Sequence, residues 1–229
     1  MTTKNKLALG LAALLLAVTA QAQSTGASPV SGISLRDNPG TLCHLFADLN
    51  CSWVDFREDG TDADGYIAGI GASTPLTPSL DVGFGYSYYR ENNHRNPFTG
   101  TPFDVRAHQL ATSATLYGAN RGFKPFVSGS LGYQWSRGDI QSLRVDDHEW
   151  IWGASVGAEI PLGTFALTPR ISYSDTFRYG SGDGSWHYGA EAHHWFNERM
   201  GGYLDATFHE PNRVGANAWT YTAGLRFRF

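Results

Sequence analysis

The end of the chain alternates strictly between apolar and small or polar side chains, and this alternation limits what the chain can fold into. From position 219 to 229 every odd-numbered residue is apolar and every even-numbered residue is Thr, Gly or Arg. A period of two places successive side chains on opposite faces of an extended strand. The same alternation recurs in 80–88, 123–135 and 149–159. The chain is therefore predicted to consist of two-faced β-strands.

The alternating runs come in pairs that are joined by short turns. Nine runs are predicted as strands: 65–73, 80–90, 106–118, 123–135, 149–159, 165–175, 186–196, 201–209 and 218–229. The polar stretches between the pairs are predicted as loops: 91–104, 137–148, 178–185 and 210–217. Barrels with short turns on one side and longer loops on the other usually have an even number of strands, so the run 49–57 is the natural tenth. We expect ten strands, with eight as the alternative if two weak runs fail to pair.

Aromatic residues distinguish a membrane barrel from a soluble sandwich, which alternation alone does not. Tyrosine and tryptophan gather at the loop ends of the predicted strands: Tyr86, Tyr88, Tyr133, Trp135, Trp150, Trp152, Tyr173, Trp186, Tyr188, Trp219 and Tyr221. Phenylalanine gathers at the turn ends: Phe123, Phe165, Phe196, Phe227 and Phe229. Two aromatic belts that flank a short apolar band indicate a barrel in a bilayer. The predicted fold is all-β, a closed antiparallel up-and-down transmembrane β-barrel.

The N-terminus has the pattern of an export signal. Lys4 and Lys6 precede an apolar run over 7–20, which ends in the small-x-small pattern Ala20-Gln21-Ala22. Fourteen apolar residues are too few for a spanning helix, which needs about 20. We therefore predict a cleaved signal peptide over 1–22, an irregular periplasmic or plug segment over 23–48, and a barrel over 49–229.

Charge and cysteine content bound the possible partners. Loss of the two lysines of the signal changes the formal net charge from −4 to −6, and no basic stripe is present that would bind nucleic acid. Cys43 and Cys51 are the two cysteines of a chain that is routed to an oxidising compartment. They are predicted to form a disulfide, since two thiols beside one histidine do not complete a zinc site.

The terminal run, Trp219-Thr-Tyr-Thr-Ala-Gly-Leu-Arg-Phe-Arg-Phe229, resembles the insertion signal of bacterial outer-membrane barrel proteins. With the alternation over 49–229, the resemblance is closest to the small opacity-type and OmpA-like barrels. It implies the outer membrane of a Gram-negative bacterium as the location, and membrane lipid and the barrel-assembly machinery as partners. The residues that carry the signal are Tyr221, Leu225, Phe227 and Phe229. These small barrels usually have eight strands, whereas we count ten.

The inward face of the predicted barrel carries charges of both signs. Its candidates are Asp81, Lys124, Glu159, Arg170, His187, Glu191, His193, Asp205, Arg226 and Arg228. Eight to ten strands enclose a narrow interior that side chains fill. We therefore predict a closed lumen with ion pairs, and no catalytic residue, cofactor or metal. The expected role is structural or adhesive, with the polar loop 91–104 as a possible binding surface.

Two alternatives stay open. In the first, the protein is an outer-membrane protease or lipid-modifying enzyme that uses His187, Glu191 and His193 together with Asp205 and His209, because a histidine oriented by a carboxylate can act as a general base. No serine in an elbow motif and no metal-binding spacing accompanies them. In the second, the lumen is a narrow channel for small solutes.

Overall fold

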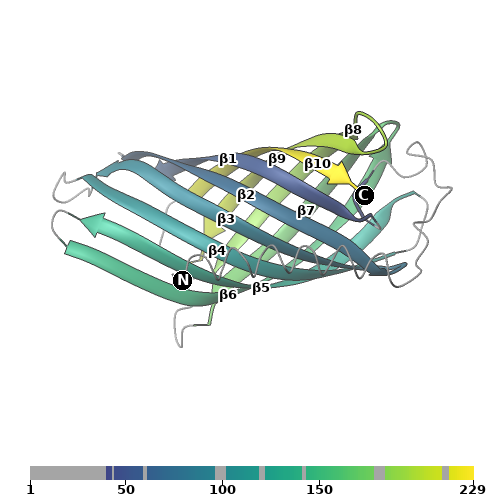
Figure 1. The fold of residues 1–229 in the computed structure, drawn as a ribbon. Helices are drawn as coiled ribbons and strands as arrows, with labels where there is room; N and C mark the ends of the chain where they lie inside the picture. Colours follow the sequence, from purple (N-terminus) through teal and green to yellow (C-terminus); the bar gives the residue numbers. More distant parts are fainter. Residues whose placement is uncertain are drawn as a thin grey trace, which may run out of the picture. The chain divides into compact units, whose positions relative to one another are not determined.

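The described residues form a closed antiparallel barrel in a computed structural model of the chain (Figure 1). The structure describes residues 40–42, 44–58, 61–95, 102–118, 122–140, 143–177, 184–212 and 217–229. The predicted signal peptide, the part of the predicted plug segment over 23–39, and Cys43 lie outside the described residues. The described part contains no helix that is long and apolar enough to cross a membrane.

Ten strands make up the barrel wall, as the count predicts. They are β1 (Phe46–Glu58), β2 (Thr61–Thr77), β3 (Leu80–Arg95), β4 (Pro102–Tyr117), β5 (Lys124–Ile140), β6 (Leu143–Leu162), β7 (Phe165–Thr176), β8 (Ser185–Trp195), β9 (Met200–Pro211) and β10 (Asn217–Arg228). Each strand pairs with its neighbours in the chain, and β1 pairs with β10 from Phe46↔Arg228 to Arg57↔Asn217. Closure leaves no sheet edge, which the interior of a bilayer requires.

Two of the predicted loops are in large part strand. β3 and β4 continue to Arg95 and from Pro102, and β5 and β6 continue to Ile140 and from Leu143. Both faces of such a hairpin are in water once it leaves the membrane, so its sequence loses the apolar alternation while its backbone ladder continues. β1 likewise begins at Phe46, three residues before the predicted strand.

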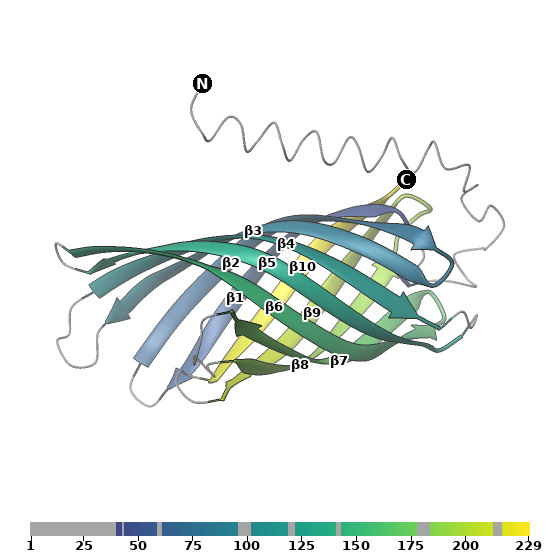
Figure 2. The same cartoon turned by 90° about the horizontal axis from the view of Figure 1, so that it is seen from below.

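The barrel wall is taller on one side. Strands β2 to β6 have 16 to 20 residues, whereas β7 to β10 have 11 or 12. A strand that crosses an outer membrane needs about 9–11 residues. The surplus of β3 to β6 projects at the loop end of the barrel (Figure 2). At the opposite end the connections are tight, and the turn from β6 to β7 uses Gly163 with a φ of 68°, which glycine adopts at little cost.

Cross-strand register sorts the side chains into two faces. Large apolar residues point outward and stay exposed, among them Leu49, Trp53, Leu116, Leu131, Val156, Ile171, Leu204, Tyr221 and Leu225. Charged residues point inward and are buried, among them Asp81, Lys124, Glu159 and Arg226. This is the inverse of a soluble protein and the arrangement that lipid around a barrel requires.

The outward aromatic residues at the loop end contact one another from strand to strand. Ring pairs include Tyr66–Tyr88, Tyr133–Trp150, Trp152–Tyr173 and Phe208–Trp219, with centroids 5.2–6.2 Å apart. At the turn end, Phe123, Phe165, Phe196 and Phe229 are more than half exposed. The structure therefore has an aromatic belt at each end of the apolar band, as the sequence predicts.

The apolar band makes a depth-dependent prediction. Leu204 lies in the middle of β9 and Leu76 lies at the turn from β2 to β3, and their side chains are similarly exposed, at 67 and 62 %. Leu204→Arg should lower the free energy of unfolding from lipid vesicles by about 2–4 kcal/mol, and the matched Leu76→Arg by about 0–1 kcal/mol. Urea titration of both refolded variants measures this, and equal losses would contradict a membrane-spanning band.

Candidate functional site: the barrel lumen

Two ion pairs reach across the strands of the lumen between β7 and β10. Arg226 on β10 bridges to Glu191 on β8, with Nη1 2.5 Å from Oε1 and Nη2 2.8 Å from Oε2. The guanidinium carbon also lies 4.0 Å from the ring centre of Tyr203 and 5.3 Å from that of Phe46. A bidentate pair held between two rings has one well-defined geometry, which suits a rigid filling of the lumen.

A second ion pair lies beside the first. Arg170 Nη1 on β7 is 2.7 Å from Asp205 Oδ2 on β9, and Nη2 donates to Thr207 Oγ1 at 3.0 Å. Thr207 Oγ1 donates in turn to Asp205 Oδ1 at 2.8 Å. Between them, β8 carries Gly189, where a Cβ atom would stand 2.4 Å from Thr207 Oγ1. The glycine allows Arg170 to pass over β8 and reach its partner.

The chain just before β1 contacts side chains at the turn end of the lumen. Glu159 Oε2 accepts hydrogen bonds from the backbone N–H groups of Thr41 at 2.6 Å and Leu42 at 3.2 Å. Lys124 Nζ lies 3.5 Å from Glu159 Oε1. Trp195 Nε1 donates to the Gly40 carbonyl at 3.1 Å, so residues 40–42 are held from two sides. The predicted lumen residue Glu159, which is paired with Lys124, thus binds residues 40–42. The sequence analysis did not predict this contact.

The other predicted lumen residues also face inward. Asp81 accepts from Tyr117 Oη at 2.9 Å. His193 is 1 % exposed, and its ring lies 4.8 Å from that of Trp195. Arg228 has the register of the inward face, and its backbone N–H donates to the Arg199 carbonyl at 2.8 Å.

Asp48 and Tyr203 are lumen residues that the sequence analysis missed. Tyr203 Oη donates to Asp48 Oδ2 at 3.1 Å. Asp48 lay in the segment predicted as irregular. It was therefore not recognised as lying on the same strand face as Asn50, two residues later. Tyr203 is aromatic, and a prediction that places apolar side chains outside and polar side chains inside does not assign an aromatic residue to the lumen.

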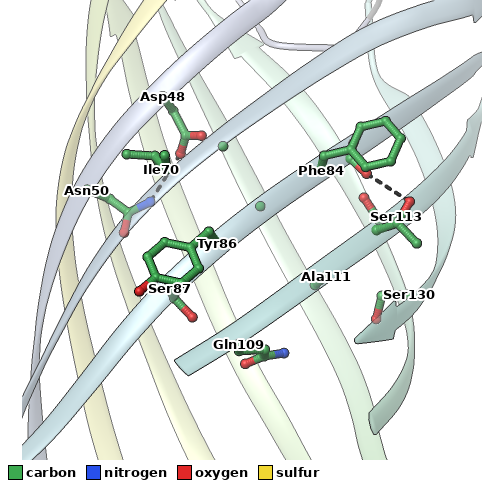
Figure 3. A pocket seen from close by; sticks show the side chains of 14 residues that line it. Asp48, Asn50, Ile70, Phe84, Tyr86, Ser87, Gln109, Ala111, Ser113 and Ser130 are labelled. Carbon is green, nitrogen blue, oxygen red and sulfur yellow. Dashed lines mark hydrogen bonds between the residues drawn. The ribbon is translucent and has the colours of Figure 1, made fainter. Parts of the chain in front are cut away.

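Between the inward charges Asp81 on β3 and Lys124 on β5, which lie near the turn end, and the loop end, strands β2 to β5 line the lumen with many small and neutral side chains. A cavity of about 320 Å³ lies against them (Figure 3). The polar lining residues on the inward face are Asp48, Asn50, Ser87, Gln109, Ser113 and Ser130. Asn50 Nδ2 donates to Asp48 Oδ2 at 3.2 Å, and Asp48 is the charged member of this lining. The two arginine ion pairs thus lie among β7 to β10, whereas the cavity lies against β2 to β5.

A chain of hydrogen bonds runs through the predicted histidines. Ser174 Oγ is 2.8 Å from His187 Nε2, His187 Nδ1 is 2.7 Å from His209 Nδ1, and His209 Nε2 is 2.8 Å from Thr220 Oγ1. Glu191 and Asp205 both form ion pairs with arginine. A histidine beside a serine is the raw material of nucleophilic catalysis. Here the second ring nitrogen of His187 contacts His209 and not a carboxylate. The backbone of Ser174 pairs with β6 and β8 in the sheet, so its N–H group is not offered as an oxyanion site by these contacts.

Cys51 is an exposed cysteine on the outward face of β1. Cys43, with which it is predicted to form a disulfide, lies outside the described residues, so the disulfide stays a prediction. Among the described residues, no group of three His, Cys, Asp or Glu could hold a metal ion.

The fold was compared with known proteins. No protein-family model matches the sequence, and no curated protein is significantly similar to it. The structure is similar to the translocator domain of autotransporter NalP from Neisseria meningitidis, with a TM-score of 0.54 and 13 % identity over 93 % of this chain and 97 % of that chain. It is also similar to the transport unit of autotransporter AIDA-I from Escherichia coli, with a TM-score of 0.51 and 10 % identity over 90 % and 94 % of the two chains.

An outer-membrane channel from Pseudomonas putida F1 is a third similar structure, with a TM-score of 0.51 and 6 % identity over 81 % of this chain and 96 % of that chain. These likenesses show a shared fold. The chain folds as an outer-membrane β-barrel with transmembrane strands, in agreement with the resemblance that its sequence shows.

The Arg226–Glu191 pair makes a prediction about stability. Both side chains are largely buried, at 9 and 14 % exposed. Arg226→Met should cost about 3 kcal/mol, because it leaves a carboxylate without its partner in the lumen. The double variant Arg226→Met with Glu191→Gln should cost less than Arg226→Met alone. Urea unfolding in vesicles compares the wild type, both single variants and the double variant, and a double variant that loses the sum of the two single effects would contradict a direct pair.

Proposed function

We propose that this protein stands in the outer membrane of a Gram-negative bacterium as a closed barrel, and that its role is structural or adhesive. The observation that carries the proposal is the division of side chains, with exposed apolar residues outside and buried ion pairs inside. A cleaved signal peptide over 1–22 would export the chain. The barrel-assembly machinery would insert it through the C-terminal signal, of which Tyr221, Leu225 and Phe229 are exposed on the outward face.

The closed lumen is supported by the three contacts that cross or cap it. Arg226–Glu191 and Arg170–Asp205 join strands on one side, and Glu159 holds residues 40–42 at the turn end. Barrels that conduct freely have about 16 strands, and ten enclose much less space. The lumen therefore acts as a rigid filling that stabilises the wall.

The tall side of the wall supports a role in surface interaction. β6 begins at Leu143, seven residues before the belt residue Trp150, whereas β8 begins at Ser185, one residue before Trp186. Seven residues extend about 23 Å along a strand. With the short turns in the periplasm, the long strands on the tall side of the wall extend beyond the outer surface of the membrane, where they could contact other surfaces. The extracellular ligand would be recognised there.

A bilayer recording tests the closed lumen. The refolded wild-type protein should show no conductance steps in planar lipid bilayers. A variant with Arg170→Ser, Glu191→Ser, Asp205→Ser and Arg226→Ser should show steps, because it removes both ion pairs and enlarges the free space in the lumen. Steps of equal size from both proteins would contradict the closed lumen.

A hairpin exchange tests the surface role. Replacement of residues 92–104 by Asn-Gly joins β3 and β4 at the Glu91↔Val105 pair and removes the projecting tip. The barrel should still insert, and cells should lose adhesion to surfaces that the parent binds. Shortening the loop 178–183 on the low side is the matched control and should leave adhesion intact. Equal adhesion in both variants would contradict the proposal that the tall side of the wall carries the adhesive surface.

A hydrolase is the second candidate, and the Ser174–His187 contact favours it. The purified parent and the variants Ser174→Ala, His193→Ala and Asp205→Ala would be assayed on peptides and on lipid A. Absence of activity in the parent ends this candidate. Activity that depends on Ser174 would replace the structural role as the main function.

A further inference from the structure

The carboxylate of Asp48 has one oxygen that is held by neighbours and one that faces the lumen cavity. Asn50 Nδ2 and Tyr203 Oη both donate to Oδ2, at 3.2 and 3.1 Å. Oδ1 lies over Gly71, where a Cβ atom would collide with it. Asp48 and Gly71 both line the cavity, and Asp48 is partly exposed. In the described part of the lumen no donor binds Oδ1, so this oxygen can accept hydrogen bonds from a ligand in the cavity.

Asn50 presents a second acceptor on the same face of β1. Its Nδ2 group is used on Asp48, and its Oδ1 lies 2.6 Å from where a Cβ atom of Gly69 would stand. Gly69 and Gly71 are the direct partners of Asn50 and Asp48, so both oxygens lie over bare backbone of β2. Figure 3 shows the two side chains beside each other at one side of the cavity. Two such acceptors suit a ligand group with several N–H donors, such as an ammonium group.

The ion pairs of the lumen leave Asp48 without a cation of its own. Arg226 forms its bidentate contact with Glu191, and Arg170 forms its ion pair with Asp205. Asp48 interacts with Arg226 at longer range only. With histidine neutral, these two arginines and three carboxylates carry one negative formal charge. A cation in the cavity would balance this charge, and the attraction is stronger in a narrow lumen than in water.

Neutral polar groups line the other side of the cavity. Ser87 and Gln109 are direct partners on β3 and β4, and Ser113 and Ser130 are direct partners on β4 and β5. Hydroxyl and amide groups can both donate and accept hydrogen bonds. They suit the polar, uncharged end of a ligand whose cationic end lies at Asp48.

The size of the cavity favours an organic cation over a bare metal ion. Its volume of about 320 Å³ corresponds to about ten water molecules and falls in the range of small-molecule sites. Hard metal ions need several oxygen ligands at short distance, whereas Asp48 is the charged member of this lining. Gly85 keeps the floor of the cavity open, because a Cβ atom there would have the Ile70 carbonyl oxygen, at 3.7 Å, as its nearest neighbour.

We propose that the lumen cavity binds a small polar organic cation. Its ammonium group donates hydrogen bonds to Asp48 Oδ1 and Asn50 Oδ1, and its uncharged end lies against Ser87 and Gln109. This ligand site goes beyond a structural or adhesive role. It requires that solutes enter the lumen from one end, and it does not require conduction.

A reporter thiol in the cavity tests the charge of the site. Ser87→Cys, in full-length mature protein with Cys43→Ala and Cys51→Ala, would be refolded in vesicles and treated with methanethiosulfonates that carry an ammonium or a sulfonate group. Position 87 is two strands from Asp48, or about 10 Å. The ammonium reagent should be favoured about tenfold more there than at Thr77→Cys, in the exposed turn from β2 to β3. Asp48→Asn should remove the preference, because it removes the charge and keeps the shape.

Protection by a free cation tests binding itself. Ethylammonium chloride should slow the reaction of the same thiol with uncharged methyl methanethiosulfonate along a saturation curve, whereas potassium chloride at equal concentration should not. Gly85→Val is the second variant, because its side chain would fill the cavity without a backbone clash. It should abolish both the charge preference and the protection in a barrel whose gel migration still changes on boiling. Thr77→Cys is the control and should show no protection.

The outcomes that contradict the inference are distinct. Equal preference for the ammonium reagent at position 87 and at Thr77→Cys would overturn it, as would a thiol at position 87 that reacts with no reagent in the folded barrel. Equal slowing by potassium would show a site for any small cation and overturn the assignment to an organic one. Failure of the protein to insert, seen as gel migration that boiling does not change, would instead overturn the proposed function.

Discussion

The closed backbone ladder is the constraint on which the rest of the structure depends. Within a bilayer each unsatisfied N–H or C=O group costs several kcal/mol, so the first strand must pair with the last. β1 and β10 do so over twelve cross-strand partners. Once the ladder is closed, side-chain parity decides which residues meet lipid and which meet the lumen. A slip of one residue would exchange the two faces of a strand, so the apolar band and the ion pairs specify the register together.

The lumen shows how a narrow barrel accommodates charges. Arg170 and Arg226 do not pair with adjacent strands, since each reaches the second strand along. Such a contact needs a small residue in the strand between, and Gly189 provides it for Arg170. The opposite wall uses Ser and Gln with small neighbours and leaves a cavity against β2 to β5 (Figure 3). The ion pairs thus supply rigidity, while the cavity beside the small side chains leaves space.

The sequence was sufficient for the features that repeat from strand to strand. Alternation predicts the ten strands, the inward position of residues such as Lys124, Glu159 and Arg226, and both aromatic belts, because each depends on parity within one strand. Which side chains contact each other across the lumen depends on the tilt and stagger of the strands, and the sequence of a single strand does not contain this information. The Tyr203–Asp48 contact and the hold of Glu159 on residues 40–42 were therefore missed.

The two longest predicted loops were in large part strand for a physical reason. The projecting hairpins were taken for loops because strand prediction relied on an apolar face, and that face is absent where both sides are in water. The backbone ladder there extends farther than the pattern of apolar residues indicates.

Collisional accessibility of a spin label at Cys51 tests most directly whether the outward face touches acyl chains. In a Cys43→Ala background, the label would be compared in vesicles with one at Glu198→Cys in the exposed turn from β8 to β9, in a chain that also carries Cys51→Ala. The account predicts that oxygen, which dissolves in lipid, relaxes the Cys51 label while a water-soluble nickel chelate does not, and that the turn label behaves in the opposite way. Equal relaxation of both labels by the chelate would contradict a barrel that stands in a membrane.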